Sequence, residues 1–288
     1  MAKPHNIELP DGTSIPIVYE DRSVLVLDKP AGWIIAPDDW YNTRRNLTLA
    51  LRSSLENGDW WAKSRSLRFL RIIHRLDAET SGLLLCAKNP NAVDAYSALF
   101  ETREVSKVYW AVVDGPLPGQ EWVRRDSFAP IPHRPGVFRV IAGDYKDAET
   151  WFKCLAQEGP LSLIEARPTT GRTHQIRLHL LASGLPVVGD ELYGREHPAG
   201  LALRAMELGY TDPFMQKRIV VRARPGDFIR RYGIRWTPPR LELPGVKPSA
   251  PLEAGHGKVR PPSSRSKSPG SSGGEKGPTS SFPPKGQK

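Results

Sequence analysis

Residues 74–88 read HRLDAETSGLLLCAK: the tetrapeptide His74-Arg75-Leu76-Asp77, a turn of small and polar residues, and an apolar run that starts after Gly82. The apolar run predicts a buried strand, so Asp77 lies at the mouth of that strand, where a strand-end nucleophile would sit. Burying part of a carboxylate costs several kcal/mol unless something compensates its charge. The fold must therefore supply a cation or several hydrogen-bond donors to Asp77.

The best candidate for that cation is Arg177, which lies in the segment GRTHQIRLH at residues 171–179. A guanidinium stays charged, and its fork can hold a carboxylate in one orientation while lowering the carboxylate's pKa. Two simpler interpretations stay open. Arg177 can be an exposed helical residue with a surface ion pair, and Asp77 can be a turn-capping residue in front of Thr80.

Together, segments 74–77 and 171–179 resemble the RluA branch of the RNA pseudouridine synthases, whose catalytic aspartate lies in an HRLD segment. Four further segments resemble those of the family and follow in the same order, starting at Lys29, Lys107, Lys146 and Pro186. Six ordered matches between about residue 15 and about residue 224 are far more specific than one short motif. The resemblance implies a pseudouridine synthase fold of the α+β class, with a mixed, mostly antiparallel, bisected sheet, flanking helices and a central RNA-binding cleft.

The activity that the resemblance implies is the isomerisation of specific uridines in structured ribosomal or transfer RNA, without a cofactor or a metal. The reaction breaks the bond between N1 and C1′, turns the base and rejoins it through C5. Asp77 fits the carboxylate that traps or stabilises the positive charge developing at C1′. The sequence leaves open whether Asp77 adds to C1′ or removes a proton from the sugar.

Two further roles come from the same resemblance. Tyr109 would stack on the base and act in removing the proton from C5; because a phenol titrates near pH 10, it needs a neighbour that favours its ionised form or takes up the proton. Ordinary sheet packing is the alternative for Tyr109. Arg75 would fill the stack that the extruded uridine vacates, and extrusion costs a few kcal/mol. Phosphate contact is the alternative for Arg75.

The remaining polar residues of these motifs are assigned to RNA contact, phosphate binding or local structure. They are His74, Lys29, Lys107 and Arg172. As acid or base groups, His74, His174 and His179 are not favoured, because no carboxylate pattern surrounds them. Structural hydrogen bonding at a strand end and on a helix explains the three histidines better.

Hydrophobic periodicity predicts many strands and few helices. Strands are expected at residues 15–19, 23–28, 69–74, 82–88, 107–114, 137–142, 149–155, 161–166, 201–208 and 218–223. Helices are expected at residues 47–55, from Asn89 to about residue 100, at 173–183 before Gly184, and briefly from residue 225. Neighbouring strands joined like hairpins favour a largely antiparallel sheet over a doubly wound one.

One stretch has no clear period and no counterpart in the family pattern. It covers residues 33–46 and 59–61 and contains Trp40, Tyr41, Trp60 and Trp61. These aromatic side chains can stack on splayed bases of a stem-loop, or they can simply cover a sheet edge. The departure leaves the identity of the RNA open.

Outside its C-terminal tail the chain is only mildly basic, a charge balance that many ordinary cytosolic enzymes share. The chain has 288 residues, 39% of them hydrophobic, and a formal net charge of +10. Residues 245–288 contain eight Lys/Arg and two Glu, so only +4 belongs to the rest. Charge alone is thus a weak argument for RNA binding. Cys86 and Cys154 lack the spacing of a disulfide framework or a zinc site and are expected in the core.

The organisation predicted from composition is an N-terminal extension at residues 1–14, a catalytic domain at 15–244, and a disordered, basic, Gly/Pro/Ser-rich tail at 245–288. No room is left before residue 15 for the small RNA-binding module of many relatives, so a member with only the catalytic domain is expected. The sequence has no apolar run of membrane-spanning length and no signal peptide, so we expect a cytoplasmic monomer that does not bind membranes.

Two other functions remain to be weighed. One is a catalytically idle RNA-binding or RNA-remodelling protein on the same fold, against which the intact set Asp77, Tyr109 and Arg177 argues. The other is a glycoside hydrolase or base glycosylase, which would need a second positioned carboxylate or an activated water. No paired acidic motif accompanies Asp77.

Overall fold

The computed structural model describes residues 2–35, 45–141 and 147–237. All described residues lie in one compact unit, Met1–Pro238. The expected tail at residues 245–288 therefore lies outside the described residues, as do Trp40, Tyr41 and Lys146.

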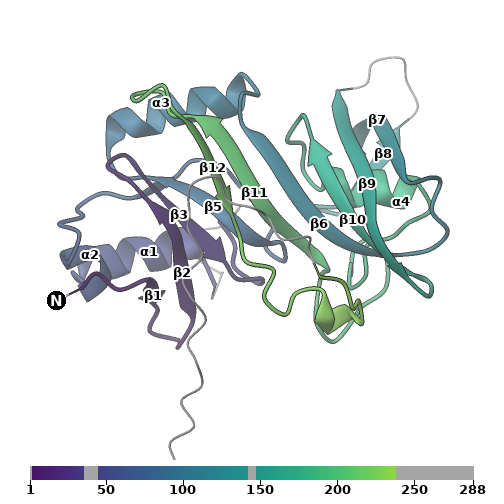
Figure 1. Cartoon of the computed structure of the whole chain (residues 1–288), viewed down its shortest axis with the longest axis horizontal. Coiled ribbons are helices and arrows are strands. Elements are labelled where there is room, and N and C mark those ends of the chain that lie inside the picture. The colour runs from purple at the N-terminus through teal and green to yellow at the C-terminus, as the bar shows by residue number, and fades with distance from the viewer. Residues whose placement is uncertain (1, 36–44, 142–146, 238–288) are drawn as a thin grey trace, which may run out of the picture. The chain divides into compact units, whose positions relative to one another are not determined.

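The described part of the chain is built on one twelve-stranded sheet (Figure 1). In spatial order its main path is β1 (Asn6–Glu8), β2 (Ser14–Glu20), β3 (Val24–Lys29), β5 (Ser81–Ala87), β11 (Leu203–Thr211), β6 (Ser106–Asp114), β10 (Leu161–Pro168), β9 (Ala148–Glu158), β7 (Glu121–Pro130) and β8 (Phe138–Ile141). Two more strands, β4 (Arg71–Ile72) and β12 (Arg218–Arg222), pair with β5 and β11. Among these strands, β5 and β11 pair parallel and the other pairs are antiparallel. The mixed, mostly antiparallel sheet expected from the sequence is confirmed.

Helices cover both sides of this sheet. They are α1 (Leu47–Glu56), α2 (Trp60–Lys63), α3 (Pro90–Glu101) and α4 (Gln175–Ala182), followed by a short 3₁₀ helix, η1 (Arg230–Tyr232). The start of α3 follows from its sequence, because the Asn89 side chain accepts a hydrogen bond from the backbone of Ala92 and Pro90 occupies the first turn. Within the described ranges, no helix has the length and apolar character needed to cross a membrane.

The alternation of side chains along β3 and β5 divides the core between two faces. On one face, Val24 and Leu83 belong to a buried cluster that includes Tyr96 of α3. On the other face, Leu25 and Leu84 belong to a second cluster that includes residues of α1. Helix α4 covers the other half of the sheet, against β7, β8, β9 and β10 (Figure 1).

Several elements differ from the expectation. Strands β1 and β7 and helix α2 were not expected, and the strand expected at residues 69–74 is reduced to β4. Ile7 in β1 is fully buried, so this strand belongs to the sheet although it precedes residue 15. The helix expected from residue 225 is a single 3₁₀ turn that begins later, at Arg230.

The two described tryptophans of the aperiodic stretch are placed differently. Trp61 is buried in the cluster beneath α1, and its indole N–H donates to Ser54 Oγ at 2.8 Å. Trp60 is 51% exposed. Covering of the sheet thus accounts for Trp61, whereas Trp60 is free to meet another molecule.

Candidate active site

A pocket of about 420 Å³ lies beside the central strands β6 and β11. Its lining comes from the loop between β4 and β5, the end of α3 with the start of β6, and the segment that leads into α4. Seven of the eight site residues predicted from the sequence line it: His74, Arg75, Asp77, Lys107, Tyr109, Arg172 and Arg177. Segments that are about a hundred residues apart thus meet in one cavity.

The eighth residue, Lys29, holds the loop that carries Asp77. Its ammonium group donates to the carbonyl oxygens of Pro30 at 2.9 Å and Ala78 at 2.8 Å, and the backbone N–H of Gly32 also donates to Ala78. Lys29 is fully buried, and burial lowers its pKa to about 8. Of the two roles expected for Lys29, the geometry supports local structure.

Gly82 fixes the other end of the same loop. Its φ of +111° lies in a region that favours glycine, and a Cβ atom added there would lie 2.2 Å from the carbonyl oxygen of Ala205. Only glycine therefore allows β5 to approach β11 this closely. The loop that carries Asp77 is thus held at both ends. Lys29 binds its backbone at Ala78, and Gly82 lies at the start of the closely spaced parallel pair of β5 and β11.

Arg177 does reach Asp77, but its main partner is a different carboxylate. Its Nη1 lies 3.3 Å from Asp77 Oδ2, whereas Nε and Nη2 donate to the two oxygens of Asp190, each at 2.7 Å. The expected pairing of Arg177 with Asp77 is therefore present, but it is made by one nitrogen, while the fork of the guanidinium binds Asp190. Burial lowers the pKa of Arg177, but the two carboxylates outweigh burial and leave this pKa raised.

Asp190 is the residue that sequence reasoning missed. It is 1% exposed, and its Oδ1 also accepts the backbone N–H groups of Leu192 and Tyr193 at 3.1 Å. Its position in the matched segment that starts at Pro186 was the only signal in the sequence. Nothing local to that segment indicates which arginine it binds, because Arg177 lies 13 residues earlier on a helix.

Tyr109 lies on β6, opposite Ala205 of β11 and Ala166 of β10. Its side chain packs against both core clusters and lines the pocket, whereas Trp110 packs edge-on against Trp236. Burial, and then the charge of Asp77, raise the pKa of Tyr109. The free protein therefore does not stabilise a tyrosinate, which is one of the two ways in which Tyr109 was expected to act as a base.

His74 is a packed structural residue on the pocket wall. Its ring stacks on Phe100 with centroids 4.6 Å apart, and its Nε2 accepts the backbone N–H of Leu85 at 3.0 Å. Burial lowers its pKa to about 3, so the ring is neutral at physiological pH. These contacts support the structural role expected for the histidine, while the neighbouring Arg75 is exposed at the rim of the pocket.

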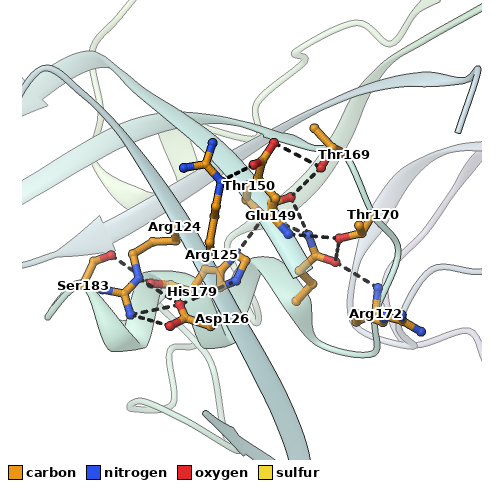
Figure 2. A network of polar contacts seen from close by, with 11 residues as sticks. Arg124, Arg125, Asp126, Glu149, Thr150, Thr169, Thr170, Arg172, His179 and Ser183 are labelled. Carbon is orange, nitrogen blue, oxygen red and sulfur yellow. Dashed lines mark hydrogen bonds and ion pairs between the residues drawn. The ribbon is translucent and has the colours of Figure 1, made fainter. Parts of the chain in front are cut away.

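Figure 2 shows how the segment before α4 is anchored. Gln175 Oε1 accepts hydrogen bonds from Thr170 Oγ1 at 2.6 Å and from the backbone N–H of Arg172 at 2.9 Å. Its Nε2 donates to the Glu149 carbonyl and to Thr150 Oγ1, both at 2.9 Å. One amide side chain thus ties the pocket wall to β9.

Two cations of the pocket depend on this wall. Lys107 Nζ donates to the carbonyl oxygen of Thr170 at 2.9 Å, and burial lowers the pKa of Lys107 to about 8. Arg172 forms an ion pair with Asp147 at 3.1 Å, and its side chain is half exposed. Both cations can therefore still meet a phosphate group.

The part of the network around His179 in Figure 2 contains none of the residues that line the pocket. His179 Nδ1 is 2.8 Å from Thr150 Oγ1, and His179 Nε2 is 3.7 Å from Asp126 Oδ2, which Arg124 holds with two hydrogen bonds. Burial lowers the pKa of His179 to about 4. The neutral ring is a structural element on the buried side of α4, as expected from the sequence.

Comparison with known proteins places this geometry in a family. A family model described as RNA pseudouridylate synthase matches residues 23–182, more than half of the chain. The chain belongs to the RluA-type RNA pseudouridine synthases. Its sheet, with few helices, is thus the α+β fold of that family, as the sequence predicted.

Individual relatives carry the same family name. Ribosomal large subunit pseudouridine synthase D of Borreliella burgdorferi is 36% identical over 193 residues, which are 65% of this chain and 56% of the relative. The dual-specificity RNA pseudouridine synthase RluA of Vibrio parahaemolyticus is 31% identical over 208 residues, 68% and 78% of the two chains. This chain therefore spans little more than half of the Borreliella relative.

A solved structure, human RNA pseudouridylate synthase domain containing 1, superposes with a TM-score of 0.58 at 25% sequence identity. The superposition covers 73% of this chain and 84% of that chain. A second solved structure, human RNA pseudouridylate synthase domain containing 4, gives the same TM-score at 21% sequence identity. The superposition covers 75% of this chain and 90% of that chain, and it supports the fold alone.

Proposed function

We propose that this protein isomerises specific uridines of structured RNA to pseudouridine, with Asp77 as the catalytic carboxylate. The observation that carries the proposal is the meeting of Asp77, Tyr109 and Arg177 in one pocket of a family member. Ribosomal RNA is the first substrate to test, because the Borreliella relative is named for the large ribosomal subunit, and transfer RNA is the second.

The proposed chemistry balances without any co-reactant. The bond from N1 to C1′ breaks, a bond from C5 to C1′ forms, one proton leaves C5 and one proton reaches N1. Asp77 meets the positive charge at C1′ during cleavage, as carboxylates do in glycoside chemistry. Arg177, 3.3 Å away, orients the carboxylate.

Tyr109 would contact the base in this scheme. Because the raised pKa keeps its phenol protonated, it would pass the C5 proton only while another group accepts a proton. Asp77 is the nearby anion, since its charge contributes to the raised pKa of Tyr109. Tyr109 therefore acts as a stacking group and a proton relay rather than as a free tyrosinate.

The test of the proposed function is direct. Purified protein is incubated with transcripts of ribosomal and transfer RNA, and pseudouridines are mapped, together with those in cells that have or lack the gene. We expect new pseudouridines at one or a few positions. RNA binding without any new pseudouridine would identify the idle binding protein instead, and release of free uracil would identify a glycosylase.

Arg75 is expected to act when the uridine leaves its stack. Arg75→Ala should reduce turnover about tenfold or more on a duplexed stem-loop, and much less on an unstructured strand with the same uridine, because only a stacked base must be extruded. Single-turnover rates on the two substrates measure the difference. Equal losses on both would indicate that Arg75, exposed at the pocket rim, contacts a phosphate instead.

Lys107 is expected to make RNA affinity depend on pH. Its pKa of about 8 means that the ammonium is present below pH 8 and is lost above it. Between pH 7 and pH 9 the protonated fraction of Lys107 falls about tenfold. RNA affinity should therefore fall by up to about tenfold over the same range, if RNA binds only the charged form. Lys107→Arg stays charged and should remove this fall. A parent protein whose affinity stays constant over that range would show that Lys107 meets no phosphate.

A further inference from the structure

His174 occupies an unusual backbone conformation at the start of α4. Its φ is +55°, in the left-handed region that non-glycine residues adopt at a cost of about 1–2 kcal/mol. It provides no side-chain cap for the helix. Instead, the imidazole lines the pocket, and its Nε2 lies 4.0 Å from Asp77 Oδ2. The strained backbone thus places a ring nitrogen beside the carboxylate.

Tyr193 holds the other side of this ring. The Tyr193 hydroxyl lies 2.8 Å from His174 Nδ1 and accepts the backbone N–H of Phe138 at 2.9 Å. The aromatic rings of Tyr193 and Phe138 both pack edge-on against the imidazole. The side chain of His174 is 12% exposed, so its orientation is set by these contacts.

These contacts favour the tautomer of His174 that carries the ring hydrogen on Nε2. Burial raises the pKa of the Tyr193 hydroxyl, which therefore keeps its proton. Since that oxygen already accepts from Phe138, its own proton is best directed to His174 Nδ1, and the ring hydrogen then sits on Nε2. The opposite tautomer would place the Nε2 lone pair against the carboxylate of Asp77. Burial also lowers the pKa of His174, although Asp77 acts in the opposite direction, so the ring is neutral.

Both neighbours of Asp77 meet the same oxygen. Arg177 Nη1 and His174 Nε2 approach Oδ2, at 3.3 Å and 4.0 Å. With both groups beside Oδ2, Oδ1 is the oxygen left for a substrate. The distance from His174 is too long for a hydrogen bond in the free protein, but catalytic contacts of this kind often tighten when substrate binds.

We propose that His174, oriented by Tyr193, is a positioning residue for Asp77: its neutral Nε2–H holds Oδ2 so that Oδ1 is presented to C1′. The inference rests on the proposed function and adds a residue to it. His179 has a similar arrangement, with a hydroxyl on Nδ1 and a carboxylate beyond Nε2, but none of these residues lines the pocket (Figure 2). The position of His174 beside Asp77, not the local pattern, therefore carries the proposal.

Kinetics test the role. His174→Ala should lower kcat about 100-fold and Tyr193→Phe about tenfold, with KM changed less than threefold, because an orienting contact matters after binding. His174→Gln, whose amide can donate from nearly the same place, should recover most of the loss. Tyr232→Phe is the matched control, since it deletes a buried hydroxyl that donates to Ala199 and Gly200 away from the pocket, and its kcat should not change.

Two kinetic results would overturn the proposal. One is a His174→Ala variant whose kcat equals that of the control variant Tyr232→Phe. The other is a higher KM at constant kcat, which would make His174 a substrate contact.

Nitrogen NMR tests the same pair without any turnover, so it separates this inference from the proposed function. The parent protein should show His174 as the Nε2–H tautomer, and Tyr193→Phe should increase the Nδ1–H form. Asp77→Asn should lower the pKa of His174, because the negative charge of Asp77 raises it. A parent protein with mainly the Nδ1–H tautomer, or a His174 pKa unchanged by Asp77→Asn, would exclude the arrangement even if the enzyme is active.

Discussion

Asp77→Asn is expected to reduce pseudouridine formation at least about 1,000-fold, while folding and RNA affinity stay close to those of the parent. Asparagine keeps the shape of the side chain but removes the charge that meets C1′. It also keeps an oxygen for Arg177, whose Nη1 lies 3.3 Å from Asp77 Oδ2. Single-turnover rates at saturating RNA, together with a binding isotherm, measure the two effects separately.

Asp28→Asn is the matched control for this substitution. The Asp28 carboxylate is 18% exposed, against 19% for Asp77, and it also pairs with an arginine, Arg204, at 2.6 Å. It does not line the pocket. The control should lose some stability and keep its turnover. If Asp77→Asn retains activity within about tenfold of the parent, Asp77 is not the central carboxylate.

The elements that the sequence predicted well are those in which local pattern and tertiary packing agree. The run before Lys88 is apolar on both faces because each face of β5 packs into one of the two core clusters. Strand β7 was missed because most of its residues are polar or charged, and only the fold shows their partners: Arg125 pairs with Glu149 and Glu121 with Lys153, both on β9. Arg124 and Asp126 pair with each other and cover His179 of α4, so buried polarity there looks like a solvent-exposed loop.

In the candidate site, too, the sequence predicted the residues that lie in motifs and missed a partner that only the fold brings close. Motifs placed Asp77, Tyr109 and Arg177 together, because each lies in a segment whose pattern resembles the family. The partner of a guanidinium is a matter of three-dimensional distance, so Asp190 was missed. Lys29 is a similar case. Its motif allowed either a phosphate contact or a structural role, and only the fold shows that the side chain is buried and bound to backbone carbonyl oxygens.

The largest effect on stability is expected from Arg177→Met. Asp190 is 1% exposed, and loss of Arg177 leaves its charge buried; among the described residues, the backbone N–H groups of Leu192 and Tyr193 are then its remaining donors. Removing one partner of a buried ion pair costs about 3–5 kcal/mol. Urea unfolding of the variant should show that loss, and turnover should fall about 100-fold or more because Asp77 also loses its cation.

A second substitution separates the two roles of Arg177. In the double variant Arg177→Met/Asp190→Asn no uncompensated charge remains at position 190, and the asparagine oxygen still accepts both backbone N–H groups, so most of the stability should return. Turnover should stay low, since Asp77 still has no guanidinium beside it. A double variant that regains activity together with stability would make Arg177 a purely structural residue. If the free energy of unfolding of Arg177→Met lies within about 1 kcal/mol of the parent's, the ion pair with Arg177 is not what stabilises the buried Asp190.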